Sequence, residues 1–285
     1  MIYGNKIKDT KRLKKNTQNW QALSKEKLII AIDQENGWIS RLNFENPLPN
    51  NMGLGATGDP FYSKIAGKIT GRRLRELGIN MNMAPVLDIN QDPNNPIIDR
   101  RSFGNDPELV TQHGIAYIEG LQNQGIMAVA KHYPGHGNVN KDSHKTLPIN
   151  TTSEDHLTHI DMSPFRQAAK HKVFGIMTAH VLYPNIDPQH PATLSKKLLE
   201  TLKKDMTFQS LIISDDLMMD AIQDHHTPLS ASIKALEAGV DICLITIPLK
   251  KVPKLVSDLK LYGKKRPEFE LLAKQKSQKI AHLKK

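Results

Sequence analysis

Short apolar segments alternate along this chain with segments that open on helix-capping residues, and this alternation limits the possible folds more than any other feature. The apolar segments span residues 27–33, 79–89, 126–132, 173–181, 211–215 and 240–246. The segments between them carry capping residues at their starts and, in three cases, a glycine at the end: Asp59, Asp106, Ser163, Ser195 and Thr227, with Gly78, Gly125 and Gly239. Near-continuous apolar strands that alternate with helices predict a parallel sheet covered by helices on both faces.

Polar and ionisable residues stand where the apolar segments end. They mark five of the predicted strands: Asp33, Asp88, Lys131 with His132, His180, and Asp215 with Asp216. In an αβ barrel the carboxyl ends of the strands form the face that holds the active site. We therefore predict the α/β class and a TIM-type (β/α)8 barrel enzyme, in which residues 1–285 form a single domain.

The number of strands falls short of a closed barrel. Six strands are clear in the sequence, whereas a barrel of this type has eight. Residues Met1–Tyr3 are a candidate for the stub of one more strand. The predicted barrel is therefore shortened at its N-terminal side, with six to seven strands visible.

The composition of the chain indicates the cellular compartment and whether the protein associates with a membrane. The one cysteine, Cys243, lies in an apolar segment, so disulfides do not hold the fold together and a reducing compartment is indicated. The first residues carry basic side chains but no apolar stretch of a secretory signal follows them. No apolar segment approaches the roughly 18 residues of a membrane span. We expect a soluble, cytoplasmic protein without a membrane partner.

The net charge of +10 raises the possibility of nucleic-acid binding, but its distribution argues against it. Residues 1–27 carry a net charge of +6 and residues 250–285 carry +9, which leaves −5 for residues 28–249. The basic residues thus gather at both ends, away from the strand-end motifs, and solvated terminal helices account for them. The ends also lack the interleaved aromatic residues that single-stranded nucleic acid needs. We predict no nucleic-acid partner.

The segment 131–148, KHYPGHGNVNKDSHKTLP, is a polar loop that follows a strand. Asp142 and His144 stand two residues apart in it, so the carboxylate can hold one imidazole nitrogen and raise the basicity of the other. Taken alone, this pair is more typical of two solvated loop residues. His132, His136 and His144 also suggest a zinc site, but proline and glycine break the helix that His-x-x-x-His requires, so we favour no metal.

The segment LIISDDLMMD, residues 211–220, runs from an apolar strand directly into two carboxylates. Burying two adjacent carboxylates at a strand end costs free energy unless each has a functional role or a hydrogen-bonding or charged partner. Capping of the following helix by Asp216 accounts for one of them, and a nucleophile accounts for Asp215. Arg41 and Arg101, taken alone, are typical of surface charges.

Six motifs in order across residues 29–220 carry a family resemblance: AIDQE-G---R, APVLD, RSFG-DP, KH-PGHG-----DSH--LP, MTAHV-YP and SDDL-M. The chain resembles family 3 of the glycoside hydrolases, and within it the single-domain bacterial β-N-acetylglucosaminidases of peptidoglycan recycling. The resemblance implies a TIM-type barrel with Asp215 as nucleophile, His144 as acid/base and Asp142 as its partner. It implies a sugar site and no metal or organic cofactor; the sugar-binding residues would be Asp33, Arg41, Arg101, Lys131 and His132.

The implied activity is the retaining hydrolysis of a terminal β-linked N-acetylglucosamine, with an N-acetylglucosamine-containing glycan as substrate. Retaining glycosidases usually pair two carboxylates, and here His144 would replace the second. Histidine, with an ordinary pKa near 6.5, can give and take a proton near neutral pH. Because a neutral histidine repels anions less than a carboxylate does, phosphate is an alternative acceptor, which would make the protein a phosphorylase.

Two features depart from the family pattern. Trp38 stands where the family usually has arginine, and Asn36 replaces a glycine, although Asp33 and Arg41 keep their spacing. Family members also carry two barrel strands before the position of Met1–Tyr3. An unclosed barrel exposes a sheet edge, so an upstream start, a second chain over the edge or a decaying gene are competing explanations. A non-catalytic glycan-binding barrel is therefore the second hypothesis for function.

Overall fold

A six-stranded parallel sheet forms the centre of the molecule in the computed structural model, which describes residues 1–2, 7–139, 141–143 and 145–284. The strands are hydrogen-bonded in the order β1, β4, β5, β6, β9 and β10. Their bounds are Ala31–Ile32, Met81–Asn82, Met127–Tyr133, Gly175–Thr178, Leu211–Asp216 and Ile242–Leu244. The order follows the chain and every pairing is parallel, as the alternation of apolar segments and helices predicted.

The candidate seventh strand at Met1–Tyr3 is represented by Ile2. Its main-chain N–H donates to the carbonyl of Ala31 at 2.7 Å, and Ile2 forms a parallel bridge with Ile32. Tyr3 lies outside the described residues. Ile2 therefore extends the sheet beside β1, at the edge opposite to β10.

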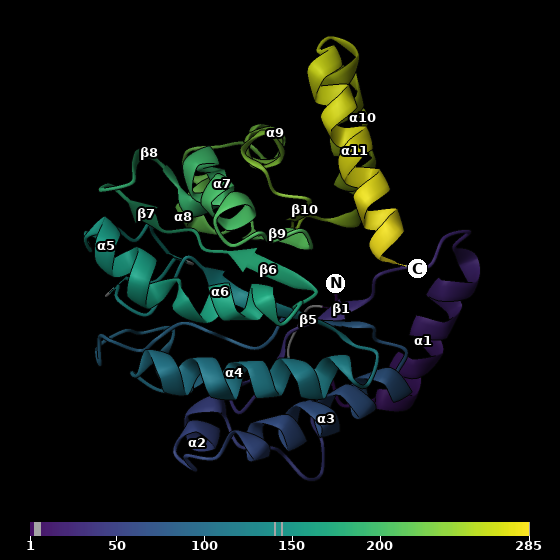
Figure 1. Cartoon of the computed structure of the whole chain (residues 1–285). Helices are drawn as coiled ribbons and strands as arrows, with labels where there is room; N and C mark the ends of the chain where they lie inside the picture. The colour runs from purple at the N-terminus through teal and green to yellow at the C-terminus, as the bar shows by residue number, and fades with distance from the viewer. Residues whose placement is uncertain (3–6, 140, 144, 285) are drawn as a thin grey trace.

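Helices follow most of the strands and cover the outer face of the sheet (Figure 1). Their bounds are α1 Thr10–Leu23, α2 Asn51–Gly55, α3 Pro60–Glu76, α4 Pro107–Gln122, α5 Glu154–His156, α6 Ser163–Lys170, α7 Lys196–Lys204, α8 Asp220–Gln223, α9 Pro228–Ala238, α10 Val252–Lys264 and α11 Pro267–Leu283. A π-helical turn, Leu157–Asp161, joins α5 to α6. Two antiparallel hairpins lie outside the main sheet: β2 Gln34–Asn36 with β3 Ile39–Ser40, and β7 Leu182–Tyr183 with β8 Asp187–Pro191.

The predicted helix caps are confirmed in four of five cases. Asp59, Asp106, Ser195 and Thr227 each accept a main-chain N–H of the first helical turn through the side chain. The expected helix ends Gly78, Gly125 and Gly239 all adopt positive φ, which glycine tolerates without steric cost. The prediction for Ser163 was wrong: Met162 precedes α6, and the Ser163 hydroxyl donates to the carbonyl of Ile160, because the chain enters α6 from a helical turn.

Side chains of the sheet alternate between two separate cores, as the two-residue period of a strand requires. The outer core lies under the helices and receives Ile32, Ala130 and Ile212 from the strands. The inner core lies on the opposite face of the sheet and consists of Ala31, Met81, Met83, Val129, Met177, Leu211 and Ile213. Ile280 and Leu283, at the end of α11, pack against this inner core. In Figure 1, α10 and α11 form a helical hairpin that projects from the body, and α11 ends near the sheet.

None of the helices in the described part of the chain combines the length and the apolar character that crossing a bilayer requires.

Candidate active site

A cavity of about 640 Å³ opens where the strands of the main sheet end. It brings together six of the residues that the sequence predicted, and they come from separate elements: Asp33 after β1, Arg41 after β3, Arg101 in the turn Asp99–Arg101, Lys131 and His132 in β5, and Asp215 in β9. Polar residues at successive carboxyl ends of parallel strands thus meet at one site, as expected for an αβ barrel.

A network of three cations and two carboxylates forms one wall of the cavity. Glu35 accepts two hydrogen bonds from Arg101, to Nε at 2.8 Å and to Nη2 at 2.9 Å, and lies 2.6 Å from Nζ of Lys131. Lys131 also donates to Asp33 at 2.9 Å, and Arg41 lies 3.8 Å from the same carboxylate. Burial would raise the pKa of Glu35, but Arg101 and Lys131 hold it well below its ordinary value. Glu35 is therefore a carboxylate that fixes the position of both cations.

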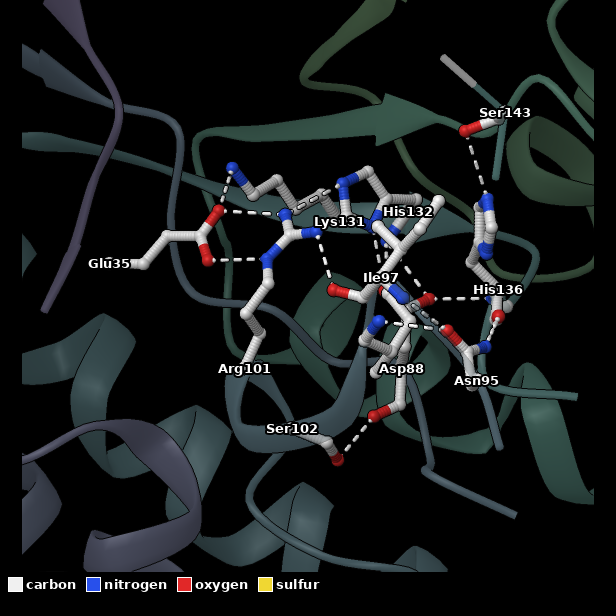
Figure 2. A network of polar contacts seen from close by, with 12 residues as sticks. Glu35, Asp88, Asn95, Ile97, Arg101, Ser102, Lys131, His132, His136 and Ser143 are labelled. Atoms are coloured by element: carbon white, nitrogen blue, oxygen red, sulfur yellow. Dashed lines mark hydrogen bonds and ion pairs between the residues drawn. The ribbon is translucent and has the colours of Figure 1, made fainter. Parts of the chain in front are cut away.

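Asp88 holds His132 in place but does not itself line the cavity, and Figure 2 shows the two residues in the polar network. Its carboxylate is buried and lies 2.6 Å from Nδ1 of His132, and it also accepts the main-chain N–H of His132. Burial would raise the pKa of Asp88, but the neighbouring His132 and His136 lower it. The contact fixes the orientation of the imidazole and leaves Nε2 of His132 near Arg101, at 3.4 Å from Nη2.

Asp215 and Asp216 have different surroundings, although they are adjacent. Asp216 accepts the main-chain N–H groups of Met218 at 3.1 Å and Thr246 at 3.0 Å, and the hydroxyl of Thr246. It therefore joins the ends of β9 and β10. Asp215 lines the cavity and accepts the N–H of Asp216 at 2.8 Å. The expected capping of the following helix by Asp216 was wrong, because Met219 precedes α8 and no side chain caps that helix. Both aspartates line the cavity, and the hydrogen bonds from Thr246 give Asp216 a structural role.

The charge state of Asp215 follows from its neighbours. Burial would raise its pKa, but His180, His132, the N–H of Asp216 and Lys131 together lower it below the ordinary value. His180 is itself buried, with Nε2 2.9 Å from the carbonyl of Asp216 and Nδ1 2.8 Å from the hydroxyl of Thr193. Asp215 is thus ionised at neutral pH, the state that a nucleophile or an electrostatic stabiliser needs.

The predicted acid/base pair is described in part. Asp142 is half-buried, and its carbonyl accepts the main-chain N–H groups of Lys145 and Thr146. His144 lies outside the described residues. Ser143, between them, lines the cavity and is hydrogen-bonded to His136, which lines it as well.

Sequence reasoning missed the roles of Glu35 and His136. A usable signal for Glu35 was its spacing, because Asp33 and Glu35 stand two apart and such residues share a face of an extended chain. His136 was considered only as a metal ligand. Within the described residues, which do not include His144, no group of three or more His, Cys, Asp or Glu side chains is arranged to hold a metal ion.

Comparison with known proteins identifies the family. The family described as glycosyl hydrolase family 3 N terminal domain matches residues 1–268. The chain belongs to glycosyl hydrolase family 3. Beta-hexosaminidase A of Pseudoalteromonas piscicida, a similar protein, is 38% identical over 249 residues, which cover 81% of this chain and 42% of that one. Beta-hexosaminidase LpqI of Mycobacterium tuberculosis is 34% identical over 240 residues, covering 81% and 61%.

Solved structures of family 3 share the fold. The family 3 β-N-acetylglucosaminidase of Paenibacillus sp. matches with a TM-score of 0.81 and 32% identity, covering 95% of this chain and 60% of that one. The curled parallel sheet surrounded by helices is thus the TIM-like N-terminal domain of family 3, which confirms the predicted fold class. The chain spans 42% to 61% of the length of these three proteins.

Proposed function

We propose that residues 1–285 form the catalytic domain of a retaining β-N-acetylhexosaminidase that removes terminal β-linked N-acetylglucosamine from peptidoglycan fragments. One observation carries the proposal: the carboxylate of Asp215 and the network of Asp33, Glu35, Arg101 and Lys131 line the same cavity. The printed names of the relatives, beta-hexosaminidase and β-N-acetylglucosaminidase, support the substrate class.

The first step forms a glycosyl–enzyme. The carboxylate of Asp215 attacks the anomeric carbon, the bond from that carbon to the leaving oxygen breaks, and the acid/base residue His144 gives its proton to this oxygen. The lowered pKa of Asp215 supports this assignment, because the attacking carboxylate must be ionised. Asp142 would hold the imidazole of His144 in the orientation that the proton transfer needs.

The second step returns the enzyme to its starting state. His144, now neutral, takes a proton from a water molecule, whose oxygen attacks the anomeric carbon. The ester bond to Asp215 then breaks, which releases the sugar with its original β configuration. Two displacements at the same carbon account for retention.

The cation–carboxylate wall would bind the sugar. Asp33 can accept hydrogen bonds from sugar hydroxyls, and Arg41, Arg101 and Lys131 can donate to them. His132 is held by Asp88 with its Nε2 next to Arg101, in reach of the same cavity. Groups fixed in this way orient the anomeric carbon toward Asp215, and orientation supplies a large part of the rate of such reactions.

The test is hydrolysis of 4-nitrophenyl β-N-acetylglucosaminide and of a muropeptide disaccharide by the purified protein. We expect turnover of both, and a loss of at least about a thousandfold in kcat for Asp215→Asn. Asp220→Asn is the matched control, because Asp220 follows in the same segment but does not line the cavity, and it should retain activity. Equal activity of Asp215→Asn and wild type would contradict the assignment.

The same assay with and without inorganic phosphate separates hydrolysis from phosphorolysis. Hydrolysis predicts free N-acetylglucosamine as the product in both conditions. Formation of the sugar 1-phosphate would replace the hydrolase by the phosphorylase. Binding of the glycan without turnover by folded wild-type protein would instead support the non-catalytic glycan-binding barrel.

A further inference from the structure

Ser143 is buried in a stretch of the loop whose other described residues, 141–142 and 145–147, are exposed or half-buried. Among the described residues from 141 to 147, it is the one that is buried, whereas Lys141, Lys145 and Thr146 are exposed. Its hydroxyl oxygen lies 3.1 Å from Nε2 of His136, and both side chains line the active-site cavity. Figure 2 shows this contact at the edge of the polar network.

His136 is held rigidly, so it can serve as an anchor. Its main-chain N–H donates to Asp88 at 2.7 Å, and its carbonyl accepts the side-chain amide of Asn95 at 2.8 Å. The next residue, Gly137, packs so tightly that an added Cβ would lie 1.6 Å from the carbonyl oxygen of Ile89. Burial lowers the pKa of His136 to about 4, so the ring is neutral at neutral pH. Asp88 therefore connects His136 to His132, which it also holds.

The position of Ser143 in the sequence suggests what its hydrogen bond to His136 does. Ser143 stands between Asp142 and His144, the two residues proposed as the acid/base pair. A general acid must reach the leaving oxygen within hydrogen-bond distance, so the chain that carries it has to be fixed relative to the sugar site. The hydroxyl–imidazole contact directly connects Ser143 to His136, which follows three residues after the end of β5.

We propose that Ser143 is a positioning residue, whose hydrogen bond to His136 fixes the part of the loop that carries the acid/base pair Asp142 and His144. This inference rests on the proposed function. The chain of contacts runs from Asp88, through the main chain and ring of His136, to the hydroxyl of Ser143. A positioning role predicts a defect in proton transfer, with the sugar site and the nucleophile unaffected.

Comparing substrates with good and poor leaving groups separates a defect in proton transfer from a general loss of activity. A 2,4-dinitrophenyl glycoside needs little protonation of its leaving oxygen, whereas a disaccharide such as N,N′-diacetylchitobiose needs a general acid, which contributes about 10²–10⁴-fold to rate. We expect Ser143→Ala to lower kcat/KM for the disaccharide by about 10–100-fold, and that for the dinitrophenyl glycoside by less than about threefold. Azide, which attacks without a general base, should restore kcat on the dinitrophenyl glycoside.

A second single variant and a double-mutant cycle test whether His136 is the partner through which Ser143 acts. His136→Asn should show the same selective loss, and the double variant should lose little more than either single variant, because both act through one contact. Ser63→Ala is the matched control: it breaks another buried serine–histidine hydrogen bond, to His113 at 2.8 Å, away from the cavity. It should leave the ratio between the two substrates unchanged.

Three results would overturn the inference. Equal losses of Ser143→Ala on both substrates would indicate a general structural role, and unchanged activity would show that the contact does not matter. Wild-type protein that hydrolyses neither substrate would overturn the proposed function, and this inference with it.

Discussion

Glu35 illustrates at the scale of one residue how the site depends on a group that does not itself need to touch the sugar. Its carboxylate is buried and contacts both Arg101 and Lys131. Without it, Arg101 would lose its carboxylate partner, and Lys131 would keep only Asp33. Removing one partner of a buried ion pair is costly, because the other charge is left uncompensated.

Glu35→Gln should therefore destabilise the protein by roughly 3–5 kcal/mol at pH 7 and raise KM, since Arg101 and Lys131 lose their fixed positions. Urea unfolding gives the free energy, with Glu119→Gln as a control. Glu119 lies 2.8 Å from Lys64 but both side chains are exposed to solvent, so we expect a loss below about 1 kcal/mol. Similar losses for the two variants would contradict the role of Glu35.

The residues of the site could be predicted to different degrees. Asp33, Lys131 and Asp215 follow apolar segments, and parallel strands bring such positions together whatever the details of packing. The contact of Asp88 with His132 could not be predicted from the sequence. It joins side chains 44 residues apart, and their distance depends on strand register. The different roles of Asp215 and Asp216 likewise depend on Thr246, which the neighbouring strand β10 brings to Asp216.

Among the elements, α11 has a role that its sequence did not reveal. The basic C-terminal segment was interpreted as a solvated helix, and most of its residues are indeed exposed. Ile280 and Leu283, however, pack against the inner core of the sheet. The helical caps were predictable because they are local, whereas this packing depends on how the hairpin of α10 and α11 returns to the sheet.

Ile280→Ala should lower the free energy of unfolding by about 1–2 kcal/mol, because the half-buried side chain loses contact with the inner core. Leu271→Ala, an exposed position of the same helix, should change it by less than about 0.5 kcal/mol. Chemical denaturation of both variants checks the difference. If Ile280→Ala matched Leu271→Ala, α11 would not be part of the core.

The stability of the whole molecule should depend on pH through Asp161. This carboxyl group accepts a hydrogen bond from Gln91 at 2.7 Å, and its Oδ2 has no partner in the described part of the chain. Burial, together with the charge of Asp88, raises its pKa to about 7. Because the folded-state pKa lies above the unfolded one, near 3.9, its favourable contribution is complete below pH 4 and is lost as pH rises to about 7.

Asp161→Asn removes this ionisation and keeps an oxygen that accepts from Gln91. The variant should gain roughly 2–4 kcal/mol over wild type at pH 8 and little at pH 4. Thermal unfolding of both proteins at pH 4, 6 and 8 measures the trend. A difference in Tm that is the same at all three pH values would contradict it.

At the scale of the fold, the class and order of strands could be predicted because apolar segments and caps recur along the chain. The inner core and the cavity could not, because they arise from the curvature of the sheet and from the loops that return over it. The likeness to other family 3 structures places this curled sheet in the TIM-like domain, although the chain spans only part of their length.

The most direct test of the account is to trap the glycosyl–enzyme. The protein is incubated with 5-fluoro-N-acetylglucosaminyl fluoride, an activated substrate that slows the second step, and digested with trypsin for mass spectrometry. The account predicts one sugar on the peptide 205–234, with fragmentation placing it on Asp215, and no label on Asp215→Asn. A label on another residue, or turnover of 4-nitrophenyl β-N-acetylglucosaminide without any label, would contradict the nucleophilic role of Asp215.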